Sequence, residues 1–129
     1  NSCRSQMAEG IANKILPNNI TIESAGTKAH GLNLNAIKVM ADISIPISHH
    51  KSKKIDLNSL DNFDTIITLC GNVKDNCLIL SDKSKHIHWD LEDPAMFKGN
   101  KHDTYNKYIE IRDIIFRNIS KLKNKILIK

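Results

Sequence analysis

The sequence predicts an α/β fold in which helices cover both faces of a small parallel sheet. Three observations favour it: a continuous apolar, β-branched run at 64–70, a second short strand at 86–89, and a long amphipathic helix over 104–124. Strands that alternate with helices form right-handed β-α-β units, and the strands of such units are parallel. The chain has 129 residues, which suits one core, so we expect a single domain over 1–129.

The first third of the chain predicts a helix and a strand. Apolar residues recur at helical spacing over 5–16, and Pro17 ends that helix. The run 20–26 is rich in β-formers and finishes with Gly26, which predicts a strand that leads into a turn. Strand and helix would then alternate from the beginning of the chain.

The middle of the chain predicts two further helices and a crossing segment. Asn33 or Asn35 can cap a helix that runs through Met40, because an Asn side chain accepts hydrogen bonds from the first N–H groups of a helix. Residues 42–48 are expected to be extended, and a short helix is expected over 57–60. The core stripe of the later helix 104–124 is expected to be Tyr108, Ile111, Ile115, Ile119 and Leu122.

Composition excludes several classes of protein. The net charge is +5, but no aromatic residues interleave with the lysines that carry it, so we expect no nucleic-acid partner. No run approaches the length of a membrane helix, and no signal peptide is visible, so we expect a cytoplasmic protein without a membrane partner. Three cysteines, an odd number, argue against a secreted disulfide scaffold.

The first five residues suggest an anion-binding cradle. Small polar residues and Arg4 stand where a helix begins, and the N–H groups at a helix N-terminus are unpaired and partly positive. The guanidinium of Arg4 offers a planar fork that suits a tetrahedral oxyanion. The alternative is that Ser2 or Ser5 only caps the helix and Arg4 is solvated.

Two cysteines, Cys70 and Cys77, flank a polar segment that follows the 64–70 strand. Such a pair suits a transient catalytic disulfide, although spacing alone favours two independent thiols. A zinc site built from this pair with His86 and His88 is disfavoured. The cysteines are further apart than paired zinc ligands usually are, and the two histidines of a strand would share a face awkwardly.

Asp93 precedes a proline just after the last predicted strand. A carboxyl group at this edge of the sheet can act as a general acid, although an aspartate before proline is more often a turn residue. His30, His49 and His50 are expected to be solvated or to form structural hydrogen bonds.

Together these segments resemble the thioredoxin-coupled arsenate reductases, which share the low-molecular-weight protein tyrosine phosphatase fold. The matching stretches are 1–10, 24–26 with His30-Gly31, 68–77 and 88–95, so the resemblance covers nearly the whole chain. It implies a three-layer αβα fold of flavodoxin-like topology. It also implies that the first strand and the nucleophilic Cys of the family's Cys-x5-Arg loop lie upstream of Asn1.

The resemblance implies roles for named residues. Asn1, Ser2, Cys3 and Arg4 would bind the oxyanion, Ser5 would lower the pKa of the upstream nucleophile, and Asp93 would protonate the leaving group. Cys70 and Cys77 would carry a disulfide relay that thioredoxin reduces. Cys3 would be structural.

Partners and cofactors also follow from the resemblance. The substrate would be arsenate, with phosphate or sulfate as mimics, and the protein would be a monomer without a tightly bound cofactor. Some family members bind potassium through residues that correspond to Asn1, Glu9, Ser24 and position 53. Lys53 stands at the last position, so its ammonium would replace the ion or the site would be lost.

Two other functions stay open at this point. A low-molecular-weight phosphatase would explain the loop and Asp93, but it would leave Cys70 and Cys77 without a role. An inactive anion-binding fragment is the other alternative, because the printed chain holds no residue six places before Arg4.

Overall fold

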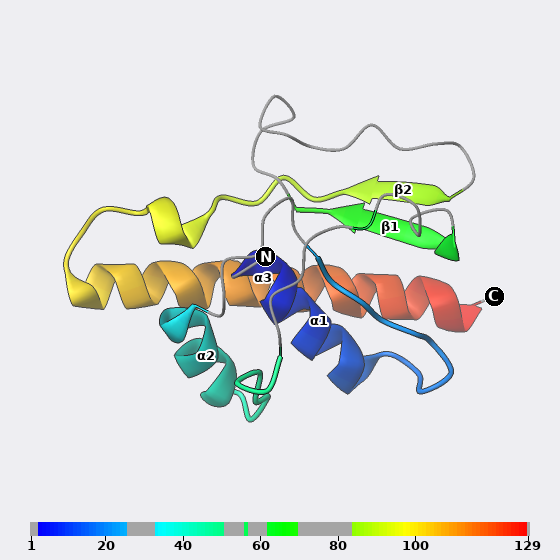
Figure 1. Ribbon diagram of the computed structural model, residues 1–129, viewed down its shortest axis with the longest axis horizontal. Helices are drawn as coiled ribbons and strands as arrows, with labels where there is room; N and C mark the ends of the chain where they lie inside the picture. The colour runs from blue at the N-terminus through cyan, green and yellow to red at the C-terminus, as the bar shows by residue number, and fades with distance from the viewer. Residues whose placement is uncertain (1–2, 26–32, 51–55, 57–61, 70–83, 129) are drawn as a thin grey trace.

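Three helices form a layer beneath a pair of strands (Figure 1). The computed structural model describes residues 3–25, 33–50, 56, 62–69 and 84–128. In chain order these contain α1 (Arg4–Ile15), α2 (Leu34–Ala41), β1 (Thr65–Thr68), β2 (Lys85–His88), the 3₁₀ helix η2 (Pro94–Met96) and α3 (Lys101–Ile128). The α/β class predicted from the sequence is confirmed, whereas the short helix expected over 57–60 lies outside the described residues.

The strands β1 and β2 are parallel, as predicted. Thr65 pairs with Lys85 and Thr68 pairs with His88, and the ladder continues through a hydrogen bond from the Trp89 N–H to the Thr68 carbonyl. A continuous apolar run such as 64–70 is typical of a buried strand, but the side chains of β1 are half-buried or exposed. Within the described residues β1 has one ladder neighbour, β2, and a single neighbour leaves much of a strand uncovered.

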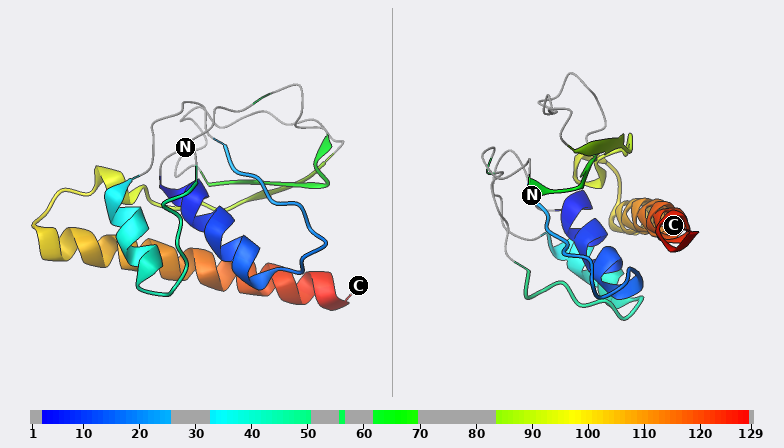
Figure 2. Two further views of the ribbon diagram at one scale, coloured as in Figure 1. Left: turned by 60° about the horizontal axis from the view of Figure 1, so that its bottom comes forward. Right: turned by 90° about the vertical axis from the view of Figure 1, so that its right-hand side faces the viewer.

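The strand predicted over 20–26 does not form in the part that the structure describes. Residues 21–25 are extended but belong to no sheet, and they return alongside α1 toward its beginning (Figures 1 and 2). A β-rich sequence becomes a strand only when a neighbour supplies ladder hydrogen bonds. The only strand pair among the described residues is β1 with β2, so 21–25 remains outside it.

The core lies between the three helices. α3 crosses both α1 and α2, and the view along α3 in Figure 2 shows the other two helices on one side of it. Four of the five predicted stripe residues of α3 are buried and Leu122 is half-buried, which confirms the amphipathic reading. The buried residues that meet there include Met7, Ile11, Val39, Met40, Tyr108, Ile111, Ile115 and Ile119.

Polar groups join these helices as well. The Asn33 side chain caps α2 by accepting hydrogen bonds from the N–H groups of Asn35 and Ala36, so Asn33 is the cap of the two that were predicted. The buried Arg112 of α3 donates a hydrogen bond of 2.9 Å to the carbonyl of Val39. This guanidinium therefore anchors α2 to α3 through the backbone.

The segment after α2 begins with a turn rather than an extended crossing. Residues 42–44 form the turn, and Ser44 has a positive φ of 62°. Ile45 and Ile47 are then buried against α1, where Gly10 lets them approach. A Cβ atom on Gly10 would lie 2.7 Å from Ile47, so this glycine permits the contact.

None of the helices that the structure describes is both long and apolar enough to cross a membrane.

Candidate oxyanion site

Among the described residues of α1 and its N-cap, no side chain caps the helix N-terminus and none in the first turn is acidic. Its N-cap residue is Cys3, whose side chain makes no capping hydrogen bond, and no acidic residue stands in the first turn. Ser5 is therefore a residue of the first turn rather than a cap. The positive end of the helix is thus not neutralised by its own side chains, as an anion site requires.

Arg4 lies at this helix end with one edge of its guanidinium anchored. Its Nη1 donates to the carbonyl oxygens of Leu69, at 2.8 Å, and Leu91, at 2.7 Å. Leu69 follows β1 and Leu91 follows β2, so one nitrogen joins the carboxyl ends of both strands. The two hydrogens of Nη1 are thereby used, so a ligand would have to meet the edge formed by Nε and Nη2, where the Asp93 carboxylate also lies.

Asp93 lies beside the same guanidinium and also shapes its own loop. Its Oδ2 is 3.7 Å from Arg4 Nη2, while its Oδ1 accepts a 3.0 Å hydrogen bond from the Ala95 N–H at the start of η2. One carboxylate oxygen of Asp93 therefore caps the turn at η2, as expected of an aspartate before proline, and the other faces Arg4. The structure thus brings together two of the predicted site residues that are far apart in the sequence.

Cys3 occupies the cradle as a neutral thiol. Burial raises its pKa from 9.0 to about 12, Asp93 adds to this rise, and Arg4 opposes it. Behind it lies the buried Tyr108, whose hydroxyl accepts a hydrogen bond of 2.9 Å from Asn33 Nδ2. Because thiol chemistry requires the thiolate, a neutral Cys3 is not a nucleophile near pH 7.

Several predicted site residues lie outside the described part of the chain. These are Asn1, Ser2, Lys53, Cys70 and Cys77. The structure therefore does not test the disulfide relay, or the roles assigned to these residues.

Glu9 and Ser24, two of the residues matched to potassium ligands, are in contact. The Ser24 hydroxyl donates to Glu9 Oε1 at 3.1 Å, and His50 Nδ1 lies 3.1 Å from Glu9 Oε2. Both carboxylate oxygens of Glu9 are thus engaged by protein groups, and the side chains of Glu9 and His50 are nearly buried.

His50 forms structural hydrogen bonds, one of the two outcomes expected from the sequence, and it helps to join α1 to the segment after α2. Besides Glu9, its Nδ1 also lies 3.1 Å from Gln6 Oε1. Gln6 is fully buried. The position of His50 against α1 depends on the turn at Ser44 and on the space left by Gly10. Because both act between segments that are distant in the sequence, no local pattern around His50 predicts its contact with α1.

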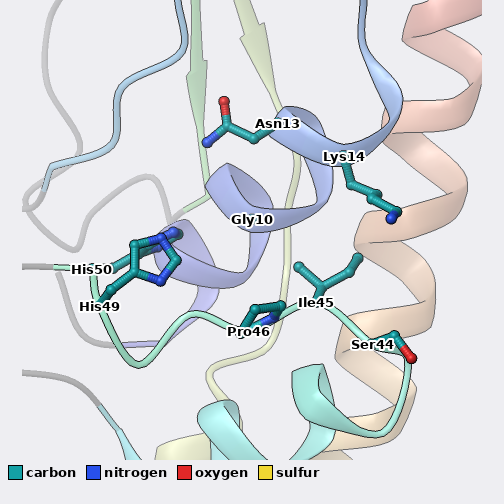
Figure 3. Close-up of a pocket in the computed structure, with 8 residues that line it drawn as sticks. All are labelled: Gly10, Asn13, Lys14, Ser44, Ile45, Pro46, His49 and His50. Carbon is teal, nitrogen blue, oxygen red and sulfur yellow. The ribbon is translucent and has the colours of Figure 1, made fainter.

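A hollow of about 280 Å³ lies on the flank of α1 near His50 (Figure 3). Asn13 and Lys14 line it from α1, and Pro46 and His49 line it from the facing segment. Its lining begins at Gly10, so it is separate from Arg4 and Cys3 at the beginning of the helix.

The structure confirms that His86 and His88 share a face of the strand pair. Both side chains lie on one face of the strand pair and both contact the hydroxyl of Thr68. Residues i and i+2 of a strand point to the same face, so the contact follows from the strand itself. Among the described residues no group of three or more His, Cys, Asp or Glu side chains is placed to hold a metal ion.

Comparison with known proteins gives consistent relatives. The profile described as low molecular weight phosphotyrosine protein phosphatase matches residues 1–129. The arsenate reductase of Oceanobacillus iheyensis is 44% identical over 115 residues, which cover 89% of this chain and 83% of that protein. The arsenate reductase of Bacillus subtilis is 43% identical, again with 89% and 83% coverage. A solved structure described as an arsenate reductase in the phosphate binding state matches with a TM-score of 0.80 and 29% identity, covering 97% of this chain and 91% of that one.

Proposed function

Because the chain belongs to the low molecular weight phosphotyrosine protein phosphatase family, we propose that it binds a tetrahedral oxyanion and reduces arsenate to arsenite. The observation that carries this proposal is the anchored guanidinium of Arg4 at the uncapped beginning of α1. Relatives at 44% and 43% identity that are named arsenate reductases support the choice of arsenate. The solved structure in a phosphate binding state supports the binding of an anion of this shape.

In the proposed reaction the nucleophilic Cys of the Cys-x5-Arg loop lies upstream of Asn1. Its thiolate attacks arsenate, which Arg4 and the loop N–H groups hold, and Asp93 gives a proton to the departing hydroxide so that it leaves as water. Ser5 donates a hydrogen bond that keeps this nucleophile ionised. The product of this step is a sulfur–arsenic bond.

The reduction step then uses the two remaining cysteines. The Cys70 thiolate attacks the arsenic-bound sulfur, a disulfide forms, and the electron pair of the sulfur–arsenic bond goes to arsenic, which leaves as arsenite. Cys77 attacks Cys70 in turn and releases the first thiolate. Thioredoxin, in the cytoplasm, supplies two electrons to reduce the resulting Cys70–Cys77 disulfide.

Steady-state assays of the intact protein test this proposal. Arsenate turnover is followed through the thioredoxin-dependent consumption of reducing equivalents, and phosphatase activity is followed with an aryl phosphate. Arg4→Lys keeps the charge but loses the fork, so both activities should fall by about 10²–10³-fold. Arg117→Lys, on the exposed side of α3, is the matched control and should change neither.

The family description itself favours a second candidate, a phosphatase that acts on phosphate esters. Cys70→Ser separates the two candidates. For an arsenate reductase this change abolishes arsenate turnover and leaves phosphate-ester hydrolysis intact. Arsenate turnover that survives in the Cys70→Ser protein would overturn the proposed relay.

A further inference from the structure

The exposed face of the strand pair carries a cluster of three side chains at its carboxyl end. Thr68 is the last residue of β1 and pairs in register with His88 of β2. Its Oγ1 lies 2.6 Å from His88 Nδ1 and 3.0 Å from His86 Nε2. Two imidazole nitrogens therefore converge on one small region of space.

This face is turned away from the helices. Ile87 and Trp89, which alternate with the two histidines, line a hollow of about 140 Å³ together with Leu122 of α3. His86 and His88 therefore lie on the opposite face, and both are exposed. The helical layer on one side of the strands is visible in Figure 2.

The hydrogen-bond chemistry of the cluster leaves nitrogen lone pairs directed inward. A threonine hydroxyl has one hydrogen to donate, so it donates to one imidazole and accepts from the other. The imidazole that accepts already presents its lone pair at the centre of the cluster. The second imidazole, which donates its N–H to Thr68, would first change tautomer. Its proton would then sit on the solvent-facing nitrogen, and its lone pair would face the centre of the cluster.

We propose that His86, His88 and Thr68 form an open site for a divalent transition metal ion of the kind that prefers imidazole, such as Zn²⁺, Ni²⁺ or Cu²⁺. The ion would lie between His86 Nε2 and His88 Nδ1, at about 2.0–2.1 Å from each nitrogen. The Thr68 hydroxyl, which contacts both nitrogens in the metal-free protein, would lie beside the ion. Water would fill the remaining positions, because the side chains are exposed. Oxygen-preferring Mg²⁺ would not bind, since the two strongest donors are nitrogens.

The site is independent of the proposed oxyanion chemistry. It uses no residue of the cradle and none of the predicted relay cysteines. Its ligands come from both strands, so an ion bound there would link β1 to β2 and raise the melting temperature of the protein.

Titration of the purified, reduced protein with Ni²⁺ tests the proposal. Calorimetry should give one saturable event, and the paramagnetic ion should broaden the amide resonances of residues 66–68 and 86–88 first. His86→Gln and His88→Gln should each weaken the binding at least about tenfold, because a glutamine amide is a poor substitute for imidazole nitrogen. His102→Gln, an exposed histidine of α3, is the matched control and should leave the affinity unchanged.

Three results would overturn the proposal. One is unchanged Ni²⁺ affinity in either His86→Gln or His88→Gln, and another is an equal loss in His102→Gln. The third is competition by Mg²⁺ at concentrations similar to those of Ni²⁺. Both replaced histidines are exposed, so the variants should fold, which the unchanged far-ultraviolet circular dichroism would show.

Discussion

At the scale of single residues, Cys3 stands next to Arg4 and yet remains a neutral thiol. Burial destabilises the thiolate more than the nearby Arg4 guanidinium stabilises it, so the pKa of Cys3 is raised. A sequence shows that Cys3 precedes a helix, but it does not show how deeply the side chain is buried. The pairing of His50 with Glu9 was hidden for the same reason, whereas the contact between Glu9 and Ser24 agrees with the family resemblance.

The raised pKa of Cys3 predicts a loss of stability in alkali. In the unfolded chain this thiol ionises near pH 9, and in the folded protein near pH 12, so the folded state holds more protons between these values. The free energy of unfolding should therefore fall as the pH rises above 9, by about 1.4 kcal/mol per pH unit. Below pH 9 this contribution is fully present.

Urea unfolding at several pH values checks this prediction. Cys3→Ala removes the titrating group and should flatten the decline between pH 9 and 10. The pKa of Tyr108 is also raised by burial, so a decline at higher pH should remain in this variant. Equal slopes for both proteins between pH 9 and 10 would contradict the assignment to Cys3.

At the scale of elements, helices were predicted better than strands. The periodicity of α1 and α3 is a property of each segment alone, and both helices begin within about three residues of the expected positions. A strand depends on a neighbour, which is why β2 formed and 21–25 did not. Gly10 likewise depends on a distant segment, because the absence of a side chain there matters only where Ile47 packs against the helix.

Replacement of Gly10 by Ala should destabilise the protein although alanine favours helices. In an open helix the change would raise stability by about 1 kcal/mol. Here the new Cβ would lie 2.7 Å from the buried Ile47 and 3.1 Å from Met40, and overpacking of this kind costs about 1–3 kcal/mol. We expect a net loss of about 1 kcal/mol in the free energy of unfolding by denaturant titration.

Asn13→Ala, on the exposed side of the same helix, is the matched control for Gly10→Ala. It should be slightly stabilising, since it gains helix propensity and meets no buried neighbour. A Gly10→Ala protein that is more stable than the original would show that α1 and the 45–47 segment are not packed as described.

For the molecule as a whole, the arrangement of charges bears on whether the protein needs a bound potassium ion. The protein has a net charge of +5, His50 lies against Glu9, and position 53 is a lysine. We propose that no potassium ion is needed, either because Lys53 replaces it or because the site is lost. The melting temperature in potassium chloride should therefore equal that in sodium chloride at the same ionic strength, and a gain specific to potassium would refute both versions.

The contacts of Arg4 also set the order in which the site can form. They join residues that are 65 and 87 positions apart in the chain, so both strand ends must be in place before Nη1 has its two acceptors. Contacts of such long range form late in folding, because a large loop must close before they are made. We therefore expect the oxyanion cradle to be assembled near the end of folding, so that a partly folded chain would lack affinity for its anion. Phosphate or sulfate should then act on the folded state alone and slow unfolding without accelerating the early steps of refolding.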